Sequence, residues 1–587
     1  MIKETEKNLP SWDLSDLYEA KEDPKISTDL GLLREKAGLF AQNYKDQIKH
    51  ISPDDLAAAI AEYENTHELG EQLSSYAYLV YSTNIKEGQS FYSYISEKVN
   101  DIMTALIFFE LELNALQDDK LQAMLVSSDK LHYYKPWLDK IRMWRKYQFS
   151  REVEEVFFIK KVTSRDAWIN LFDESITNLR FPWQGESLNI SKITDLFSSK
   201  NPEHRKEAAL SLGKTLKENI GVFVAVINAT AKDRGIDDKF RGFKTPISHR
   251  NLCNFVEDDV VSTLIDTVKA NYGNLSQRYY KLKSKAFGKA KLNYWDRNAP
   301  WPGDEERYIP WHEAKEIVLS AYSGFSEEMA GIAKTAFEEN WIDAKISDNK
   351  VSGAFSHPTV PSKHPYVLLN YSGKMRDVLT LAHELGHAIH QVFANKKGVI
   401  FSQQPLTFAE TASIFGEQLT FRYLLGKMQD KKQRNLLIAS KIEDMLNTSV
   451  RQIAICDFER QVHEARKKNM LDAEEIGEIW LAAQSESLGQ AVNLFGDYRY
   501  FWAYIPHIVH SPFYVYAYAF GECLVNSLYE VYMNDSADFA ARYINLLGNS
   551  GVMLHRELLS CFELSAYEKS FWQKGLNMID RLIDEIE

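Results

Sequence analysis

A helical segment with the pattern His-Glu-x-x-His is the feature that most limits what this chain can be. Residues His383 to His387 read HELGH, and the surrounding run 377–393 is apolar at helical spacing. Residues four apart lie on one face of a helix, so both histidines project the same way. Two imidazoles one turn apart can hold one zinc ion, and Glu384 between them can take a proton from the water that the metal activates. The motif therefore predicts a metal centre.

Other His-Glu pairs in the same chain can be compared with this motif. The dipeptide His-Glu occurs three more times, but none of these has a second histidine three residues after the glutamate. The positions where that histidine would stand are occupied by Glu71, Glu316 and Lys467. Only the segment 383–387 has the complete pattern.

A catalytic zinc needs a third protein ligand and keeps its fourth position open. His390 lies on the same helix face, but at about 10 Å along the axis from His383 it is too far for metal–ligand bonds of about 2 Å. The other candidates are Glu410 and Glu417, in the apolar run 405–424. Glu410 is favoured because its small neighbours permit close helix approach. Glu417, seven residues on and on the same face, is expected to orient a ligand histidine, and a solvated acidic side chain is the alternative.

The composition and net charge of the chain limit the kinds of partner that it can bind. The net charge of −13 repels phosphate backbones and speaks against nucleic acid. The best apolar run, 220–231, is too short to cross a bilayer, so no membrane partner is expected. The segment 1–14 lacks the apolar core of a signal peptide, and the four cysteines have no CxxC spacing, which fits a reducing compartment. A cytoplasmic protein is expected.

The residue pattern along the chain is mostly helical, with short extended stretches. Alternation around Gln184-Gly185 predicts a hairpin, and alternation over 341–357 predicts a second hairpin turning at Asp348-Asn349. A third short strand is expected at 365–371, directly before the motif helix. The predicted helices include 27–46, 52–83, 91–117, 151–163, 405–426, 434–468, 473–488 and 511–532.

This residue pattern predicts a mostly α fold with a small β-sheet beside the HExxH helix. We expect three regions along the chain. They are an N-terminal helical region (1–110), a helical lobe segment with a hairpin (111–200) and a catalytic metallopeptidase domain (201–587).

Five segments together resemble one known family. They are NLPSWDLSDLY at 8–18, GAFSHP at 353–358, LLNYSGKMRDVLTLAHELGHAIH at 368–390, FAETAS at 408–413 and IPHIVHSPFYVYAYAFGE at 505–522. In this order they resemble the oligoendopeptidase F branch of the thimet-oligopeptidase family of zinc metallopeptidases. The resemblance covers most of the chain and is more specific than HExxH alone.

The resemblance implies zinc ligands at His383, His387 and Glu410, with Glu384 as general base. It also implies a two-lobed helical ellipsoid that encloses a deep substrate channel and admits short, unfolded peptides. Members of the branch are typically bacterial and cytosolic. An N/N/O ligand set would also accept cobalt or manganese.

The segment 505–522 carries further candidates. A tyrosine hydroxyl is a neutral donor near pH 7, which suits a developing oxyanion. Tyr514 and Tyr518 are one helical turn apart on the predicted helix. Together with the resemblance this predicts His507, Tyr518 and Tyr514 as catalytic residues. Tyr516 and His510 are expected to bind substrate, and an aromatic core stripe is the alternative interpretation.

The segment 351–357 is predicted to be an edge strand. Gly353 and Ala354 leave room for an extended peptide to add as a further strand. Gly353, Ala354 and Phe355 are therefore expected to bind substrate backbone, and an ordinary hairpin is the alternative.

We conclude from the sequence that the chain is a zinc endopeptidase acting on oligopeptides with one zinc ion, as a monomer or small homo-oligomer. Three alternatives stay open. They are a zinc carboxypeptidase, a non-catalytic peptide-binding relative with a structural zinc, and a helical scaffold with a coincidental motif.

Overall fold

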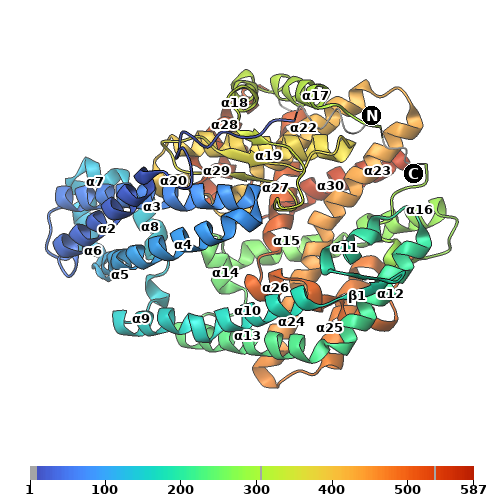
Figure 1. The fold of residues 1–587 in the computed structure, drawn as a ribbon, viewed down its shortest axis with the longest axis horizontal. Helices are drawn as coiled ribbons and strands as arrows, with labels where there is room; N and C mark the ends of the chain where they lie inside the picture. The colour runs from blue at the N-terminus through green and yellow to red at the C-terminus, as the bar shows by residue number, and fades with distance from the viewer. Residues whose placement is uncertain (1–8, 304–306, 535–536) are drawn as a thin grey trace. The chain divides into compact units, whose positions relative to one another are not determined.

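The computed structural model describes residues 9–303, 307–534 and 537–587. Residues 1–8, on which the signal-peptide prediction partly rests, lie outside that description. The chain is mostly helical, as expected, and its strands are two or three residues long (Figure 1). It forms two compact units from alternating stretches of chain. Unit 1 comprises Met1–Lys146, Glu306–Lys427 and Asp535–Phe562, and unit 2 comprises Tyr147–Glu305, Met428–Asn534 and Glu563–Glu587. The division into 1–110, 111–200 and 201–587 stays a prediction.

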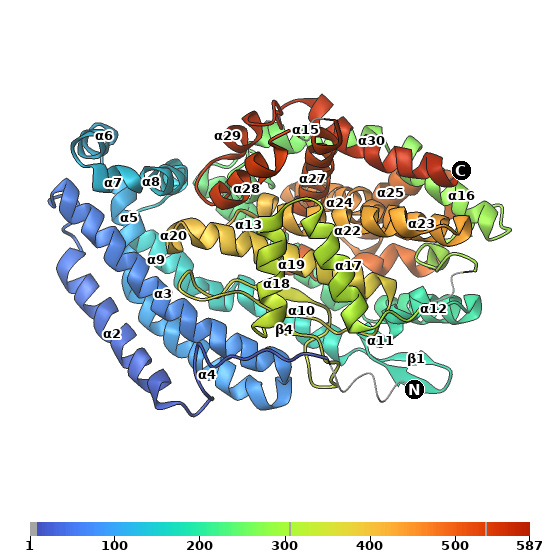
Figure 2. The same cartoon turned by 90° about the horizontal axis from the view of Figure 1, so that it is seen from above.

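Unit 1 contains the motif helix, α19. Its longest helices near the N-terminus, α2 to α4, pack side by side around a core that includes Leu33, Phe40 and Ile60 (Figures 1 and 2). The helices of unit 1 are α2 (Pro24–Tyr44), α3 (Pro53–Thr83), α4 (Ile85–Met103), η2 (Thr104–Leu106), α5 (Phe108–Ala115), α6 (Asp118–Ser127), α7 (Asp129–Tyr133), α8 (Lys135–Arg142), α17 (Trp311–Ser323), α18 (Glu327–Glu338), α19 (Met375–Asn395), α20 (Val399–Ser402), α21 (Leu406–Ala409), α22 (Thr411–Lys427), α28 (Phe539–Asn549) and α29 (His555–Ser560).

The small sheet of unit 1 lies next to α19, but its pairing differs from the expected hairpin. Its strands are β4 (Ile342–Asp343), β5 (Phe355–His357) and β6 (Tyr366–Leu368), in the order β4-β6-β5. β6 pairs parallel to β4 and antiparallel to β5. The predicted hairpin over 341–357 is therefore wrong, because the later strand lies between its two arms. The predicted strand at 365–371 is confirmed as β6.

The loop between β4 and β5 has a buried lysine at its base. Lys350 Nζ donates to Asp343 Oδ1 at 2.5 Å and to the carbonyl oxygens of Lys345 and Leu369 at 2.7 and 2.6 Å. The amide of Val351 donates to the Ser82 carbonyl at the end of α3. These bonds take the place of the ladder that the hairpin would have formed.

Unit 2 is also helical and carries one true hairpin. β1 (Phe181–Trp183) pairs antiparallel with β2 (Glu186–Leu188), and Gln184 and Gly185 turn with φ of 48° and 84°, so the first hairpin prediction is confirmed. The other elements are α9 (Arg151–Lys160), η4 (Lys161–Thr163), α10 (Arg165–Asn178), α11 (Ile190–Asp195), η5 (Leu196–Ser198), α12 (Pro202–Glu218), α13 (Ile220–Arg241), α14 (Ser248–Cys253), α15 (Asp258–Ala270), η6 (Gly273–Gln277), α16 (Arg278–Ala286), β3 (Leu292–Asn293), η7 (Tyr294–Asp296), α23 (Lys431–Thr448), α24 (Val450–Lys468), α25 (Ala473–Leu488), η8 (Gly489–Ala491), β7 (Val492–Asn493), η9 (Gly496–Tyr504), α26 (His507–His510), α27 (Tyr516–Asn534) and α30 (Lys569–Ile586).

Several helices predicted as continuous are interrupted or shortened. The run 91–117 is divided into α4 and α5 by the short helix η2. The run 405–426 breaks at Glu410 into α21 and α22, and 434–468 breaks at Ser449 into α23 and α24. The run 511–532 begins only at Tyr516, because Phe513 has a φ of 62° and its amide donates to the Glu459 carboxylate at 2.8 Å. In the described part of the chain, no helix is long and apolar enough to span a membrane.

Candidate metal centre

The helix α19 holds the HELGH segment in the core of unit 1. Its apolar side, which includes Leu381, Leu385 and Ile389, has no exposed surface. Both motif histidines project from the opposite side and retain part of their surface, with ring centroids 5.0 Å apart. The helix therefore presents two imidazoles to one point, as the four-residue spacing predicts.

A second helix, α22, approaches α19 so closely that only glycine fits at the contact. A Cβ added at Gly386 would stand 2.4 Å from the carbonyl oxygen of Ala412 and 2.6 Å from Cα of Ser413. Tyr322, on α17, donates its hydroxyl to the Ala382 carbonyl at 2.8 Å. The glycine of the motif thus has a packing role, because it sets the distance between the two helices.

This approach brings Glu410 to the histidines. Glu410 lies in the break between α21 and α22, and its Oε2 is 3.2 Å from His383 Nε2 and 3.4 Å from His387 Nε2. The three ligand atoms all lie within 4.8 Å of one another. Two imidazole nitrogens and one carboxylate oxygen are the ligand set of many catalytic zinc sites. The donor set and its convergence fit a zinc ion.

Two further groups hold these ligands in place. Glu417, on α22, lies with Oε2 at 3.2 Å from His383 Nδ1, so it orients the ring as the seven-residue spacing suggested. Ser413 donates its hydroxyl to Glu410 Oε2 at 2.9 Å. Burial opposes the charged form of His383, but the two carboxylates outweigh it and raise the pKa of this imidazole well above its usual value. The negative potential at this point favours a cation.

Glu384 is the most enclosed of the predicted catalytic groups. Glu384 is 6% exposed, and burial raises the pKa of its carboxyl above the usual value. About two turns further along α19, Gln391 exchanges hydrogen bonds with Ser356 of β5, at 2.8 Å to its hydroxyl and 3.2 Å to its carbonyl. The motif helix and strand β5 are therefore fixed to each other. Neither Ser356 nor Gln391 was singled out from the sequence, which gives no signal for this pair.

Strand β5 is an edge strand, since β6 is its only pairing partner among the residues that the structure describes. Phe355 opens it, and Gly353 and Ala354 stand just before it, with Gly353 at a φ of 87°. Asn370 donates its side-chain amide to the carbonyls of Val351 and Gly353 at 3.0 and 2.9 Å. The second edge of β5 is the one that an extended chain could pair with.

His507, Tyr514 and Tyr518 form a cluster in unit 2. His507 Nε2 is 3.3 Å from the Tyr518 hydroxyl, and the rings of Tyr514 and Tyr518 meet edge to face at 5.2 Å. All three retain part of their exposed surface. Tyr514 precedes α27, so it reaches Tyr518 from the turn before the helix and does not stand one turn away within it. The candidate metal ligands and Glu384 belong to unit 1, and this cluster belongs to unit 2.

The two other predicted residues of this segment lie in different environments. Tyr516 has no exposed surface, and its hydroxyl accepts a hydrogen bond from Asn254 at 2.8 Å. His510 ends α26 with Nε2 at 2.7 Å from Asp173 Oδ1. Because its side chain is enclosed by unit 2, we do not propose Tyr516 as a substrate-binding residue.

Comparison with known proteins identifies the family. A model of Peptidase family M3 matches residues 196–576, and a model described as Oligopeptidase F matches residues 112–181. Oligopeptidase PepF of Bacillus subtilis (strain 168) is 24% identical over 551 residues, covering 91% of this chain and 81% of the relative. The oligoendopeptidase F homolog of Borreliella burgdorferi is 26% identical over 586 residues, covering 98% and 97%. The crystal structure of oligoendopeptidase-F from Enterococcus faecium shares the fold, with a TM-score of 0.74 and 20% identity over 96% of this chain and 98% of that one.

Fold and site together define a metallopeptidase. The chain belongs to peptidase family M3, whose model covers well over half of it. It is a metallo-endopeptidase of the oligoendopeptidase type, so the resemblance inferred from the five sequence segments is confirmed.

Proposed function

We propose that the chain hydrolyses internal bonds of short, unfolded peptides, using one zinc ion held by His383, His387 and Glu410. The observation that carries this proposal is the convergence of three ligand atoms within 4.8 Å beside a buried carboxyl on the same helix. A structural zinc site would not need that carboxyl, which is the group a hydrolase uses as a base.

A zinc ion bound there would supply Lewis acidity to the scissile carbonyl and to the attacking water. Glu384 takes the proton of that water and then delivers it to the departing amine nitrogen. Burial of Glu384 suits this task, because a carboxyl that is only 6% exposed shields the proton from bulk water between the two steps. Glu417 and Ser413 keep His383 and Glu410 oriented, through the contacts at 3.2 and 2.9 Å.

The substrate backbone pairs with the free edge of β5, next to Gly353, Ala354 and Phe355. The register of the substrate is supported by the hydrogen bonds exchanged between Gln391 and Ser356, which tie this strand to the motif helix. A peptide has to be extended to add as a strand, so a folded protein is a poor substrate.

His507, Tyr518 and Tyr514 donate hydrogen bonds to the substrate, and Tyr518 is the favoured donor to the oxyanion. The support is their mutual contact and their partial exposure in unit 2. His510 is kept as a weaker candidate for substrate binding, because Asp173 already occupies its Nε2.

We further propose a cytoplasmic location and a monomer or small homo-oligomer, with no nucleic-acid partner. The acidic balance of the chain and its scattered cysteines support this.

A mass-spectrometric digest tests the function. The purified protein is given a mixture of short peptides and one folded protein, with chelator, without chelator, and after zinc is restored to the chelated sample. We expect internal cuts in the peptides only, lost with chelator and regained with zinc. Removal of single C-terminal residues would establish a carboxypeptidase. Zinc binding without any cleavage would establish a peptide-binding relative.

A further inference from the structure

Unit 2 contains a cavity that the peptidase mechanism does not use. Water-sized groups have about 30 Å³ of space in it, and part of the cavity is open to solvent. Two arginines, Arg297 and Arg451, contribute to its wall from distant parts of the chain. The other lining residues are aromatic or amide: Phe197, Tyr294, Trp295, Asn298, Trp480, Tyr498, Phe501 and Tyr504.

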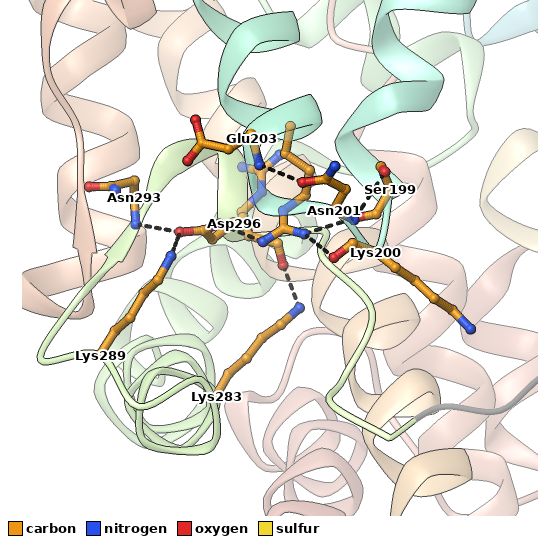
Figure 3. Close-up of polar contacts among 10 residues, drawn as sticks. Ser199, Lys200, Asn201, Glu203, Lys283, Lys289, Asn293 and Asp296 are labelled. Carbon is orange, nitrogen blue, oxygen red and sulfur yellow. Dashed lines mark hydrogen bonds and ion pairs between the residues drawn. The ribbon is translucent and has the colours of Figure 1, made fainter.

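The acidic groups beside this cavity are already paired with other cations. Asp296, which has no exposed surface, accepts from Arg205 at 2.8 Å and from Lys289 at 2.6 Å. Figure 3 shows Lys289 and Asn293 directed at Asp296. The carboxylate of Glu443 pairs with Lys283 at 2.5 Å. Asp497, next to the lining residue Tyr498, pairs with Lys217 at 3.4 Å. These three carboxylates therefore already have cationic partners.

Arg297 and Arg451 have no such partner. Within residues 9–303, 307–534 and 537–587, no carboxylate forms an ion pair with either guanidinium. Burial, and then the charge of Arg297, lower the pKa of Arg451, so the two cations are close enough to repel each other. Both arginines retain part of their exposed surface, so a small anion can reach them and relieve the repulsion between the two charges.

The backbone at Arg297 is held in place. Its carbonyl oxygen accepts from Lys283 Nζ at 2.8 Å, and the preceding residue, Asp296, is fixed by Arg205 and Lys289. Its Nε donates to the neighbouring Asn298 side chain at 3.4 Å. The guanidinium thus starts from a rigid base, which lowers the entropy cost of binding a ligand.

The walls of the cavity add neutral donors and an apolar lining. Burial raises the pKa of Tyr498 above its usual value, so its hydroxyl stays protonated. The ring of Tyr498 packs against Tyr294 at 4.8 Å and Phe501 at 4.9 Å. Protonated phenols supply no negative charge to the arginines, and the aromatic rings exclude water, which strengthens the attraction for an anion.

We propose that this cavity is a binding site for a small carboxylate anion, held by Arg297 and Arg451. A guanidinium presents parallel N–H groups that match a carboxylate in bidentate geometry. The carboxylate has two sources: a free small acid, or the C-terminus of a peptide. Tyr504, on the cavity wall, stands three residues before His507 in the chain.

The test is a titration of the zinc-loaded protein with sodium acetate in chloride-free buffer, with a bulky sulfonate salt holding ionic strength constant. Trp295 and Trp480 line the cavity, so their fluorescence reports occupancy, and calorimetry gives the Kd. The variants are Arg297→Gln and Arg451→Gln. Arg451→Lys keeps the positive charge, and its affinity for acetate tests the proposal if the glutamine variants do not fold. Arg460→Gln is the matched control, because Arg460 lies on the same helix, outside the cavity, and its side chain is 42% exposed.

We expect saturable acetate binding, a Kd raised at least about tenfold in both glutamine variants, and no change in the control. Arg451→Lys should weaken binding by about tenfold, because it loses the bidentate geometry. Absence of a saturable response in the wild-type protein, or equal affinity in all variants, would overturn the proposal.

Acetyl-phenylalanine and its amide distinguish the two sources. Tighter binding of the acid than of acetate identifies a peptide C-terminus as the source, and equal binding identifies a free small acid. Binding of the amide with the same affinity as the acid would overturn the carboxylate assignment. The titration involves no peptide hydrolysis, so its result is independent of the proposed peptidase activity.

Discussion

Gly386→Ala tests whether the close approach of α19 and α22 sets the metal-ligand geometry. The added Cβ would stand 2.4 Å from the Ala412 carbonyl oxygen and 2.6 Å from Ser413 Cα, and both are backbone atoms that cannot rotate away. An ordinary contact is about 3.4 Å or more, so α22 must retreat by about 1 Å. Glu410 directly precedes α22 and would move with it.

The size of the expected loss of zinc affinity follows from how little a zinc–ligand distance can vary. Metal–ligand distances hold to about 0.2 Å, and the required displacement is about five times larger. We expect zinc affinity to fall by about 100-fold or more, and overpacking to cost about 1–3 kcal/mol of stability. Both effects come from a residue that contacts no metal.

The assay is competition for zinc with a chromophoric chelator, together with urea denaturation of the metal-free protein. Gly331→Ala is the matched control, since Gly331 also lies inside a helix, α18, and its Cβ would meet no atom within 4 Å. That control should gain up to about 1 kcal/mol of stability and keep its zinc affinity. A Gly386→Ala variant that binds zinc within about threefold of wild type would refute the reasoning.

Three further substitutions have separate expectations. Glu417→Gln removes the charge that faces His383 Nδ1 at 3.2 Å, so zinc affinity measured by chelator competition should fall by about tenfold, and an unchanged affinity would remove its orienting role. Burial raises the pKa of Glu459 to about 8 from 4.5, so folding takes up a proton between these values and this carboxyl costs stability as pH rises through that window. Relative to Glu459→Gln, the wild-type protein should lose about 3 kcal/mol between pH 5.5 and 8 in urea denaturation; the exposed Glu464→Gln on the same helix is the control, and parallel profiles for all three would contradict the assignment. Tyr518→Phe should lower kcat by about tenfold or more with little change in KM, whereas the enclosed Tyr516→Phe should leave kcat unchanged; equal kinetics for both would exclude Tyr518 as the oxyanion donor.

The motif helix and its ligands could be predicted because the information is local. The four-residue spacing of His383 and His387 fixes their common face, and the small residues around Glu410 indicate close helix approach. The seven-residue step to Glu417 likewise follows from helical periodicity. Local periodicity thus predicted the side chains that meet in unit 1.

The remaining features depend on contacts between distant parts of the chain. The alternation over 341–357 suggested a hairpin, but the later strand β6 pairs with both of its arms. Tyr516 belongs to the same aromatic run as Tyr514 and Tyr518, and only the folded unit distinguishes it, by its burial and its hydrogen bond with Asn254. The break at Glu410 could not be read from a run with good helical periodicity.

The cavity between Arg297 and Arg451 was absent from the sequence interpretation for the same reason. Neither arginine belongs to a motif, and single arginines are usually surface residues. What distinguishes them is that Asp296 and Glu443 already have other partners, which is a property of the folded unit.

The most direct test of the central claim is zinc content measured together with peptide turnover in Glu384→Gln. Glutamine keeps the size of the buried side chain and removes only its capacity to accept a proton, and Glu464→Gln, from another His-Glu pair in the chain, is the matched control. The account predicts one zinc per chain in both variants, with turnover reduced by several orders of magnitude in Glu384→Gln alone. Turnover close to wild type in zinc-loaded Glu384→Gln would contradict the account, because the buried carboxyl would then not be the base.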